Sequence, residues 1–355
     1  MTTNKSALHE KDGVSQPETT NKISAERIKQ NRAKRNSSDE FVSKILEGNI
    51  TFLSRAITLV ESTNPKHQQK ANEILERCLP YANNSVRIGI TGVPGVGKST
   101  FIEAFGKHLT SKGKKVAVLA VDPSSSLNKG SILGDKTRME QLVTDKNAFI
   151  RPSPSGTSLG GVAQKTRESI ILCEAAGFDT ILIETVGVGQ SETLVHSMVD
   201  FFLLLKLAGA GDELQGIKRG IIEMADAIVI NKADGENEKN AKIAKVEFNR
   251  ALHLYPLKDS NWQPKVLTAS ALQNIGIAKI NDMILKYFEL TKKNNYFNKR
   301  RNEQNTFWLL STIEQELKSN FYNNQKIKAA LQKEINNLEN SLTTPFNAAK
   351  RLLNL

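Results

Sequence analysis

The stretch that decides the fold reads Gly92-Val93-Pro94-Gly95-Val96-Gly97-Lys98-Ser99. It matches the phosphate-binding pattern G-x-x-x-x-G-K-[ST] at every fixed position. Residues 87–91 before it form a short apolar run that predicts a strand, and residues 100–111 after it have the apolar spacing of a helix. A strand, a glycine turn and a helix start together predict a P-loop, in which backbone N–H groups converge on phosphate oxygens.

Each position of this P-loop has an expected task. Its glycines permit backbone conformations that residues with a Cβ avoid, so the amides can turn toward the phosphates. We expect Lys98 to reach the β- and γ-phosphates and the Ser99 hydroxyl to bind Mg²⁺. The predicted phosphate-binding residues are Gly92, Val93, Pro94, Gly95, Val96, Gly97, Lys98, Ser99 and Thr100.

The composition is that of a globular protein, with 39% hydrophobic and 24% charged residues in a chain of 355. No apolar run approaches the roughly 20 residues that a membrane span needs, so we expect no membrane partner. Residues 1–38 are polar, which predicts a disordered tail. This tail has no apolar signal core and contains several acidic residues, which predicts a cytoplasmic protein.

A net charge of +12 raises the question of a nucleic-acid partner. The densest basic run, residues 292–301, has no nucleic-acid-binding motif beside it. We therefore interpret it as a solvated linker between two helices, a surface that an acidic protein partner could also use. Cys78 and Cys173 are isolated and the five His do not cluster, so we expect buried thiols and no zinc or nickel site built by the protein.

Strands alternate with helices from the P-loop onward. Six apolar runs predict strands at residues 87–91, 116–121, 180–184, 201–206, 227–230 and 266–268. Because these runs are apolar on both faces, they predict an α/β fold with a doubly wound, mostly parallel sheet and a ligand at the carboxyl ends of its strands. A helical extension with Ser38 as a possible N-cap precedes the sheet, and amphipathic helices follow residue 275. Residues 346–353 fit either a docking tail or an end helix.

The segment Asn231-Lys232-x-Asp234 indicates which base is bound. A carboxylate at Asp234 accepts hydrogen bonds from guanine N1 and N2, whereas adenine has no such donor pair and would leave the carboxylate unpaired. Sites of this kind discriminate by about 10⁴-fold or more. We expect Asn231 to bridge the purine edge and neighbouring loops, and the Lys232 stem to lie along the base. The backbone N–H groups expected at O6 belong to Ser270, Ala271 and Leu272.

Acidic residues at strand ends are candidates for the magnesium shell. Asp122 and Glu184 end two predicted strands and could hold metal-bound waters beside Ser99. Asp135 could close over the γ-phosphate or simply cap a helix. Gly187 is placed to sense the γ-phosphate and to move the segment that follows it.

The attacking water also needs a residue to orient it. Gln190 could do this, or it could pack at a helix start. The candidate catalytic residues are therefore Lys98, Glu184 and Gln190.

Several stretches resemble one family, the GTPase chaperones of adenosylcobalamin-dependent methylmalonyl-CoA mutase, also called the arginine/ornithine-transport kinase-like family. The resemblance covers residues 41–284, and Glu184 in place of the commoner Asp is typical of the group. The matching stretches are the P-loop, Val121-Asp-Pro-Ser-Ser125, Gly134-Asp-Lys-Thr-Arg-Met139, Arg151-Pro-Ser-Pro-Ser-Gly156, Glu184-Thr-Val-Gly-Val-Gly-Gln-Ser-Glu192, Gly209-Ala-Gly-Asp-Glu-Leu-Gln-Gly216 and Asn231-Lys-Ala-Asp-Gly235.

The resemblance implies a slow, magnesium-dependent GTPase that works as a homodimer and gates, protects or reactivates a mutase. It places Asp122, Asp135 and Glu184 in the magnesium shell, and a third switch with Asp212, Gln215 and Lys218 as the relay to the mutase. The sequence itself predicts a disordered tail (1–38), a helical extension (39–84), a P-loop GTPase domain (85–290) and a helical segment (291–355), for which the resemblance implies a role in dimerisation. A kinase that phosphorylates a transport protein is an alternative, and a nickel-delivering GTPase is disfavoured by the missing Cys and His clusters.

Overall fold

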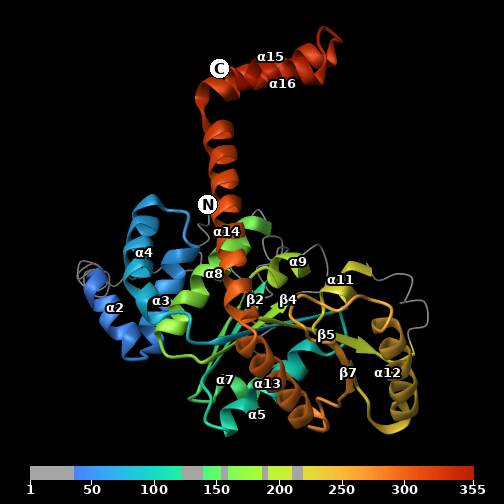
Figure 1. Ribbon diagram of the computed structural model, residues 1–355. Helices are drawn as coiled ribbons and strands as arrows, with labels where there is room; N and C mark the ends of the chain where they lie inside the picture. The colour runs from blue at the N-terminus through green and yellow to red at the C-terminus, as the bar shows by residue number, and fades with distance from the viewer. Residues whose placement is uncertain (1–35, 122–138, 153–158, 186–190, 210–218) are drawn as a thin grey trace, which may run out of the picture.

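A computed structural model describes residues 36–121, 139–152, 159–185, 191–209 and 219–355 (Figure 1). These residues contain one sheet with the strand order β3-β2-β4-β1-β5-β6-β7, in which every neighbouring pair is parallel. Its strands are β1 (Val86–Gly92), β2 (Val116–Val121), β3 (Ala148–Arg151), β4 (Thr180–Thr185), β5 (Phe201–Leu207), β6 (Ala227–Asn231) and β7 (Lys265–Thr268). The predicted α/β class with a doubly wound parallel sheet is confirmed.

Helices cover both faces of this sheet, as parallel strands require. The helices between the strands are α5 (Lys98–Ser111), α7 (Glu140–Val143), α8 (Leu159–Ala175), α9 (Ser191–His196), α11 (Arg219–Met224) and α12 (Glu238–Leu252), with a 3₁₀ turn η2 (Gly235–Asn237). One core packs α5 and α13 (Ile277–Lys293) against Ile88, Ile90 and Leu182. The opposite core contains Ile181, Ile183 and Phe202 with residues of α8.

The amino-terminal helices α2 (Ser38–Leu46), α3 (Ile50–Glu61) and α4 (Pro65–Cys78) pack on α8, and the 3₁₀ turn η1 (Leu79–Tyr81) leads from them into β1 (Figure 1). Helix α2 begins one residue earlier than expected, because Ser37 rather than Ser38 accepts the N–H of Glu40 at 3.1 Å. A side-chain oxygen at the N-cap satisfies one of the free amides of the first turn.

The carboxyl-terminal helices form an arm. Helix α14 (Tyr296–Asn323) leaves the body, and α15 (Gln325–Glu339) and α16 (Pro345–Leu353) lie at its far end (Figure 1). Residues 346–353 are therefore helical, one of the two expectations for them. In the part of the chain that the structure describes, no helix combines the length and apolarity needed to cross a membrane.

Two further expectations were wrong. The strand β3 is missing from the predictions because it is a four-residue edge strand in which only Phe149 is buried, so its apolar signal is weak. The basic run at 292–301 is not a solvated linker, because α13 continues to Lys293 and α14 begins at Tyr296. Arg301 is 8% exposed and forms a buried ion pair with Asp200 across 2.7 Å.

Candidate nucleotide site

The P-loop joins β1 to α5, and two of its glycines are required by close approaches. Gly92 has φ 153°, and a Cβ there would lie 2.6 Å from the carbonyl oxygen of Leu205 on the neighbouring strand. Gly97 has φ 91° and caps α5, and a Cβ there would lie 2.9 Å from Nδ2 of Asn231. Side chains cannot be added at either position without displacing the loop, so the backbone stays open to a ligand.

Lys98 starts α5 with its ammonium group inside the P-loop. Its Nζ donates hydrogen bonds to the carbonyl oxygens of Gly92 at 2.8 Å and Val93 at 3.2 Å, and the residue is 9% exposed. Burial lowers the pKa of Lys98, whereas the carboxylates of Glu184 and Glu192 oppose that shift. The two hydrogen bonds keep the Lys98 amino group inside the loop, where it can meet an anion.

Ser99 and Glu184, both predicted around a metal, are in contact. The Ser99 hydroxyl donates to Oε1 of Glu184 at 3.2 Å, and Glu184, the penultimate residue of β4, is 9% exposed. A hydroxyl and a carboxylate oxygen side by side are the donor types that magnesium prefers. These two residues therefore fit the predicted ion.

The predicted base-binding segments lie beside the P-loop. Asn231 donates from Nδ2 to the carbonyl of Val96 at 2.9 Å, and its Oδ1 accepts the N–H of Ala271 at 3.3 Å. The Ser270 hydroxyl donates to the carboxylate of Asp234. Asn231 thus belongs to one segment expected at the base and connects it to the P-loop through Val96 and to the other segment through Ala271.

Lys232 and the amides of the last segment complete this region. Lys232 has φ 56°, and its Cε lies 3.8 Å from the position of a Cβ on Gly97. The N–H of Ser270 donates to the carbonyl of Ile275 at 3.0 Å, so it is already engaged. Leu272 is 81% exposed at the rim.

Glu192 was not singled out from the sequence. It lies in the first turn of α9, is 6% exposed and acts on the charge of Lys98. Its place eight residues after Glu184 in one polar stretch was the available signal. The predicted residues that fall outside the described part of the chain are Asp122, Asp135, Gly187, Gln190, Asp212, Gln215 and Lys218.

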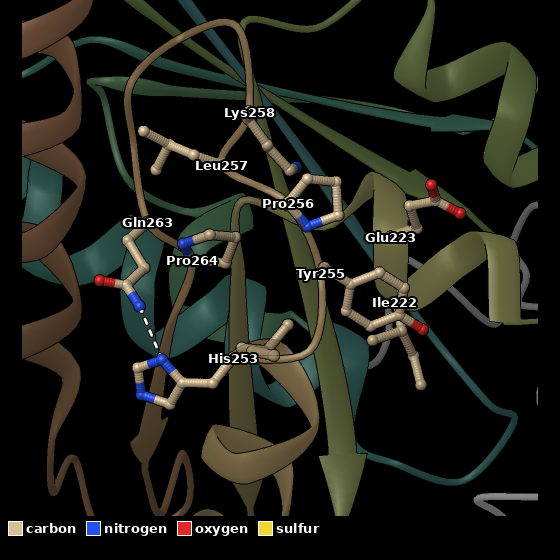
Figure 2. A pocket seen from close by; sticks show the side chains of 10 residues that line it. Ile222, Glu223, His253, Tyr255, Pro256, Leu257, Lys258, Gln263 and Pro264 are labelled. Carbon is tan, nitrogen blue, oxygen red and sulfur yellow. Dashed lines mark hydrogen bonds between the residues drawn. The ribbon is translucent and has the colours of Figure 1, made fainter.

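A separate hollow of 420 Å³ lies between α11 and residues 252–264 (Figure 2). Tyr255, Pro256 and Pro264 line it, and Gln263 Nε2 and His253 Nδ1 lie 2.9 Å apart at its edge. Of the described residues predicted to bind nucleotide, none lines this hollow. It is therefore distinct from the candidate site.

Comparison with known families agrees with this geometry. The family model described as methylmalonyl Co-A mutase-associated GTPase MeaB matches residues 53–326. The chain belongs to this family. Membership in a GTPase family implies that the chain binds guanine nucleotides.

Named relatives span most of the chain. A probable GTPase of Mycobacterium tuberculosis is 47% identical over 89% of this chain and 94% of its own length. The GTPase ArgK of Escherichia coli is 45% identical over 88% of this chain and 95% of its own. The mitochondrial methylmalonic aciduria type A homolog of mouse is 42% identical over 89% of this chain and 78% of its own.

A solved structure supports the same placement. The crystal structure of an LAO/AO transport system kinase superposes with a TM-score of 0.72 at 39% identity, covering 89% of this chain and 96% of that one. The two names in this family, GTPase and kinase, describe different fates of the terminal phosphate, which a labelled nucleotide can distinguish.

Proposed function

We propose that the protein hydrolyses GTP and uses this reaction as a chaperone of an adenosylcobalamin-dependent acyl-CoA mutase, with methylmalonyl-CoA mutase as the first candidate client. The observation that carries the proposal is the Asn231 bridge between the P-loop and the base-binding segments, in a member of a mutase-associated GTPase family. A phosphate loop joined to a guanine-selective segment is the arrangement that GTP requires.

The chain's own residues have defined tasks in this reaction. Lys98 exchanges the carbonyls of Gly92 and Val93 for phosphate oxygens when the nucleotide enters. Its fixed positive charge then stabilises negative charge that develops on the transferred phosphoryl group. Asp234, oriented by the Ser270 hydroxyl, accepts the two donors of the guanine edge.

The contact between Ser99 and Glu184 supports magnesium as the cofactor. When bound, magnesium neutralises charge on the β- and γ-phosphates. We assign Asp122 and Asp135 to the same shell, and Gln190 to the attacking water. Gly187 is assigned to the γ-phosphate, so that the segment after β4 responds to hydrolysis.

The proposal includes a partner surface and a homodimer. We assign the relay to the mutase to Asp212, Gln215 and Lys218, and gating of cofactor loading and protection or reactivation of the mutase to the nucleotide state of this segment. The arm supports dimerisation, since Leu309 and Leu317 of α14 are 62% and 64% exposed and a second copy would cover them.

The test is GTP turnover measured as free phosphate, with and without purified methylmalonyl-CoA mutase. We expect slow turnover alone, acceleration by the mutase, and no turnover for Lys98→Ala. Lys218→Ala should keep the slow rate and lose the acceleration, whereas Lys239→Ala on the exposed side of α12 should behave as wild type.

The same experiment separates the kinase alternative. Labelled γ-phosphate that appears on a protein instead of in solution would favour phosphoryl transfer, the reaction after which the related transport system kinase is named. Equal turnover with and without every mutase tried would contradict the chaperone role.

A further inference from the structure

The sheet opens between β1 and β4 at the edge that carries the candidate site. Pairing between these two strands ends at Ile90 and Glu184. Beyond that pair, β1 stays joined to β5 as far as Gly92, and β4 stays joined to β2 as far as Thr185. The two central strands therefore part from each other while each remains held by its outer neighbour. The P-loop leaves one side of this gap, and Glu184 stands on the other.

Two side-chain bridges cross the gap, one on each face of the sheet. On the α5 face, Ser99 donates to Glu184 at 3.2 Å. On the other face, the hydroxyl of Thr185 donates to that of Thr91 at 2.8 Å. Residues two apart on a strand point to the same face, so Thr91 shares a face with Gly89. A Cβ on Gly89 would lie 3.0–3.1 Å from side chains of α9 and of the turn after it. The Thr91–Thr185 bridge therefore lies on the side of α9.

Core packing alone does not require these two hydroxyls. Thr91 is 1% exposed and Thr185 is 0% exposed, and the residues paired with them on the outer neighbouring strands, Leu204 and Val121, are apolar. Valine has nearly the same shape and an equal preference for strands, so it would fill these positions without burying polar groups. Two buried hydroxyls that satisfy each other instead fix a distance between the strands that carry them.

We propose that the Thr91–Thr185 bridge is a positioning device that sets the separation of the P-loop from the end of β4. Thr91 directly precedes Gly92, and Thr185 directly follows Glu184. The bridge holds Glu184 at the distance from Ser99 at which both can serve one magnesium ion. This inference rests on the proposed GTPase function, and it adds two residues that act by positioning the P-loop and Glu184.

The test measures binding as well as turnover, on the full chain. A fluorescent, non-hydrolysable GTP analogue is titrated in magnesium and again in EDTA, for the wild type, Thr185→Val and Thr185→Ser. The matched control is Thr180→Val at the other end of β4, where the hydroxyl is also buried and donates to Asp179 at 2.8 Å. Turnover of GTP is measured for the same set.

We expect magnesium to tighten binding to the wild type, Thr185→Ser and Thr180→Val alike. For Thr185→Val we expect unchanged affinity in EDTA, a three- to tenfold loss of the tightening by magnesium, and a similar fall in kcat, the size of about one neutral hydrogen bond. If magnesium tightened binding to Thr185→Val as much as to the wild type, this inference would be overturned and the proposed GTPase function would stand. Equal weakening in EDTA and in magnesium would also overturn it, since a merely structural role acts on both. A wild-type chain that binds no guanine nucleotide would remove the proposed function and this inference together.

Discussion

Removal of Arg301 tests how the arm is attached to the body. The guanidinium donates two hydrogen bonds to the carboxylate of Asp200 at 2.8 and 2.7 Å, and one each to the carbonyls of Asn83 at 2.9 Å and Ser85 at 2.8 Å. It also lies over the ring of Phe297 at 4.3 Å. These contacts join the first turns of α14 to the amino ends of β1 and β5, on the side of the sheet opposite the nucleotide site.

The expected size of the effect follows from burial. The side chain of Arg301 is 9% exposed and that of Asp200 is 2% exposed, so Arg301→Leu leaves a carboxylate inside the protein without its cation. Breaking one side of a buried pair costs about 3–5 kcal/mol. The N–H of Arg87 still donates to Asp200 at 2.9 Å, which places the expected loss near the lower end, about 3 kcal/mol.

The assay is urea unfolding of the full chain at fixed protein concentration. With a slope of about 3 kcal/mol per M, the midpoint of Arg301→Leu should fall by about 1 M. Adding Asp200→Asn should recover part of the loss, because asparagine still accepts the Arg87 N–H but carries no charge. Arg351→Ala, which breaks a pair whose arginine side chain is 51% exposed, should leave the midpoint unchanged. A loss below 1 kcal/mol for Arg301→Leu would refute the reasoning.

Three further predictions concern the site and its surroundings. Gly97→Ala should reduce GTP binding at least tenfold in calorimetry, since φ 91° and the contact with Asn231 both oppose a Cβ; an unchanged affinity would contradict the observed loop. Asp234→Asn should weaken GTP and admit xanthosine triphosphate in competition binding; undiminished guanine preference would contradict the base assignment. Burial and Arg300 lower the pKa of His196 to about 3, below its ordinary 6.5, so the unfolded chain takes up a proton first as pH falls. Stability should therefore drop below pH 6.5 by up to about 1.4 kcal/mol per pH unit, and His196→Gln should lose that part of the slope between pH 7 and pH 5 in urea titrations.

The features that could be predicted from the sequence are those that consecutive residues determine, namely the P-loop and the buried strands. A phosphate loop must be built from neighbouring backbone amides, so its pattern is written in one stretch, and the structure brings Lys98, Ser99, Asn231 and Asp234 to the same edge of the sheet. Buried strands were recognisable because each of them is a run of consecutive apolar residues. The short edge strand β3 was not, because only one of its side chains is buried.

Pairings between distant residues could not be read from the chain. The carboxylate of Glu174 meets Arg87, and Asp200 meets Arg301, across 87 and 101 residues of sequence. Whether an arginine is solvated or buried depends on which helix packs over it, and the basic run gave no sign of that packing. The Thr91–Thr185 bridge could not be predicted either, because the register between β1 and β4 determines which side chains of the two strands meet.

The attachment of α14 has a mechanical consequence. Its residues Arg300, Gln304 and Trp308, spaced four apart, donate to the carbonyls of Val199, Val199 and Ser197 in the turn that follows α9. Beyond Trp308 the helix continues over residues 309–323, about 22 Å at 1.5 Å per residue. Because a helix is stiff over this length, a 10° tilt at its root sweeps its tip through about 4 Å. A small displacement of the turn after α9 therefore produces a larger displacement at the far end of α14. Helices α15 and α16 lie at that end and move with it.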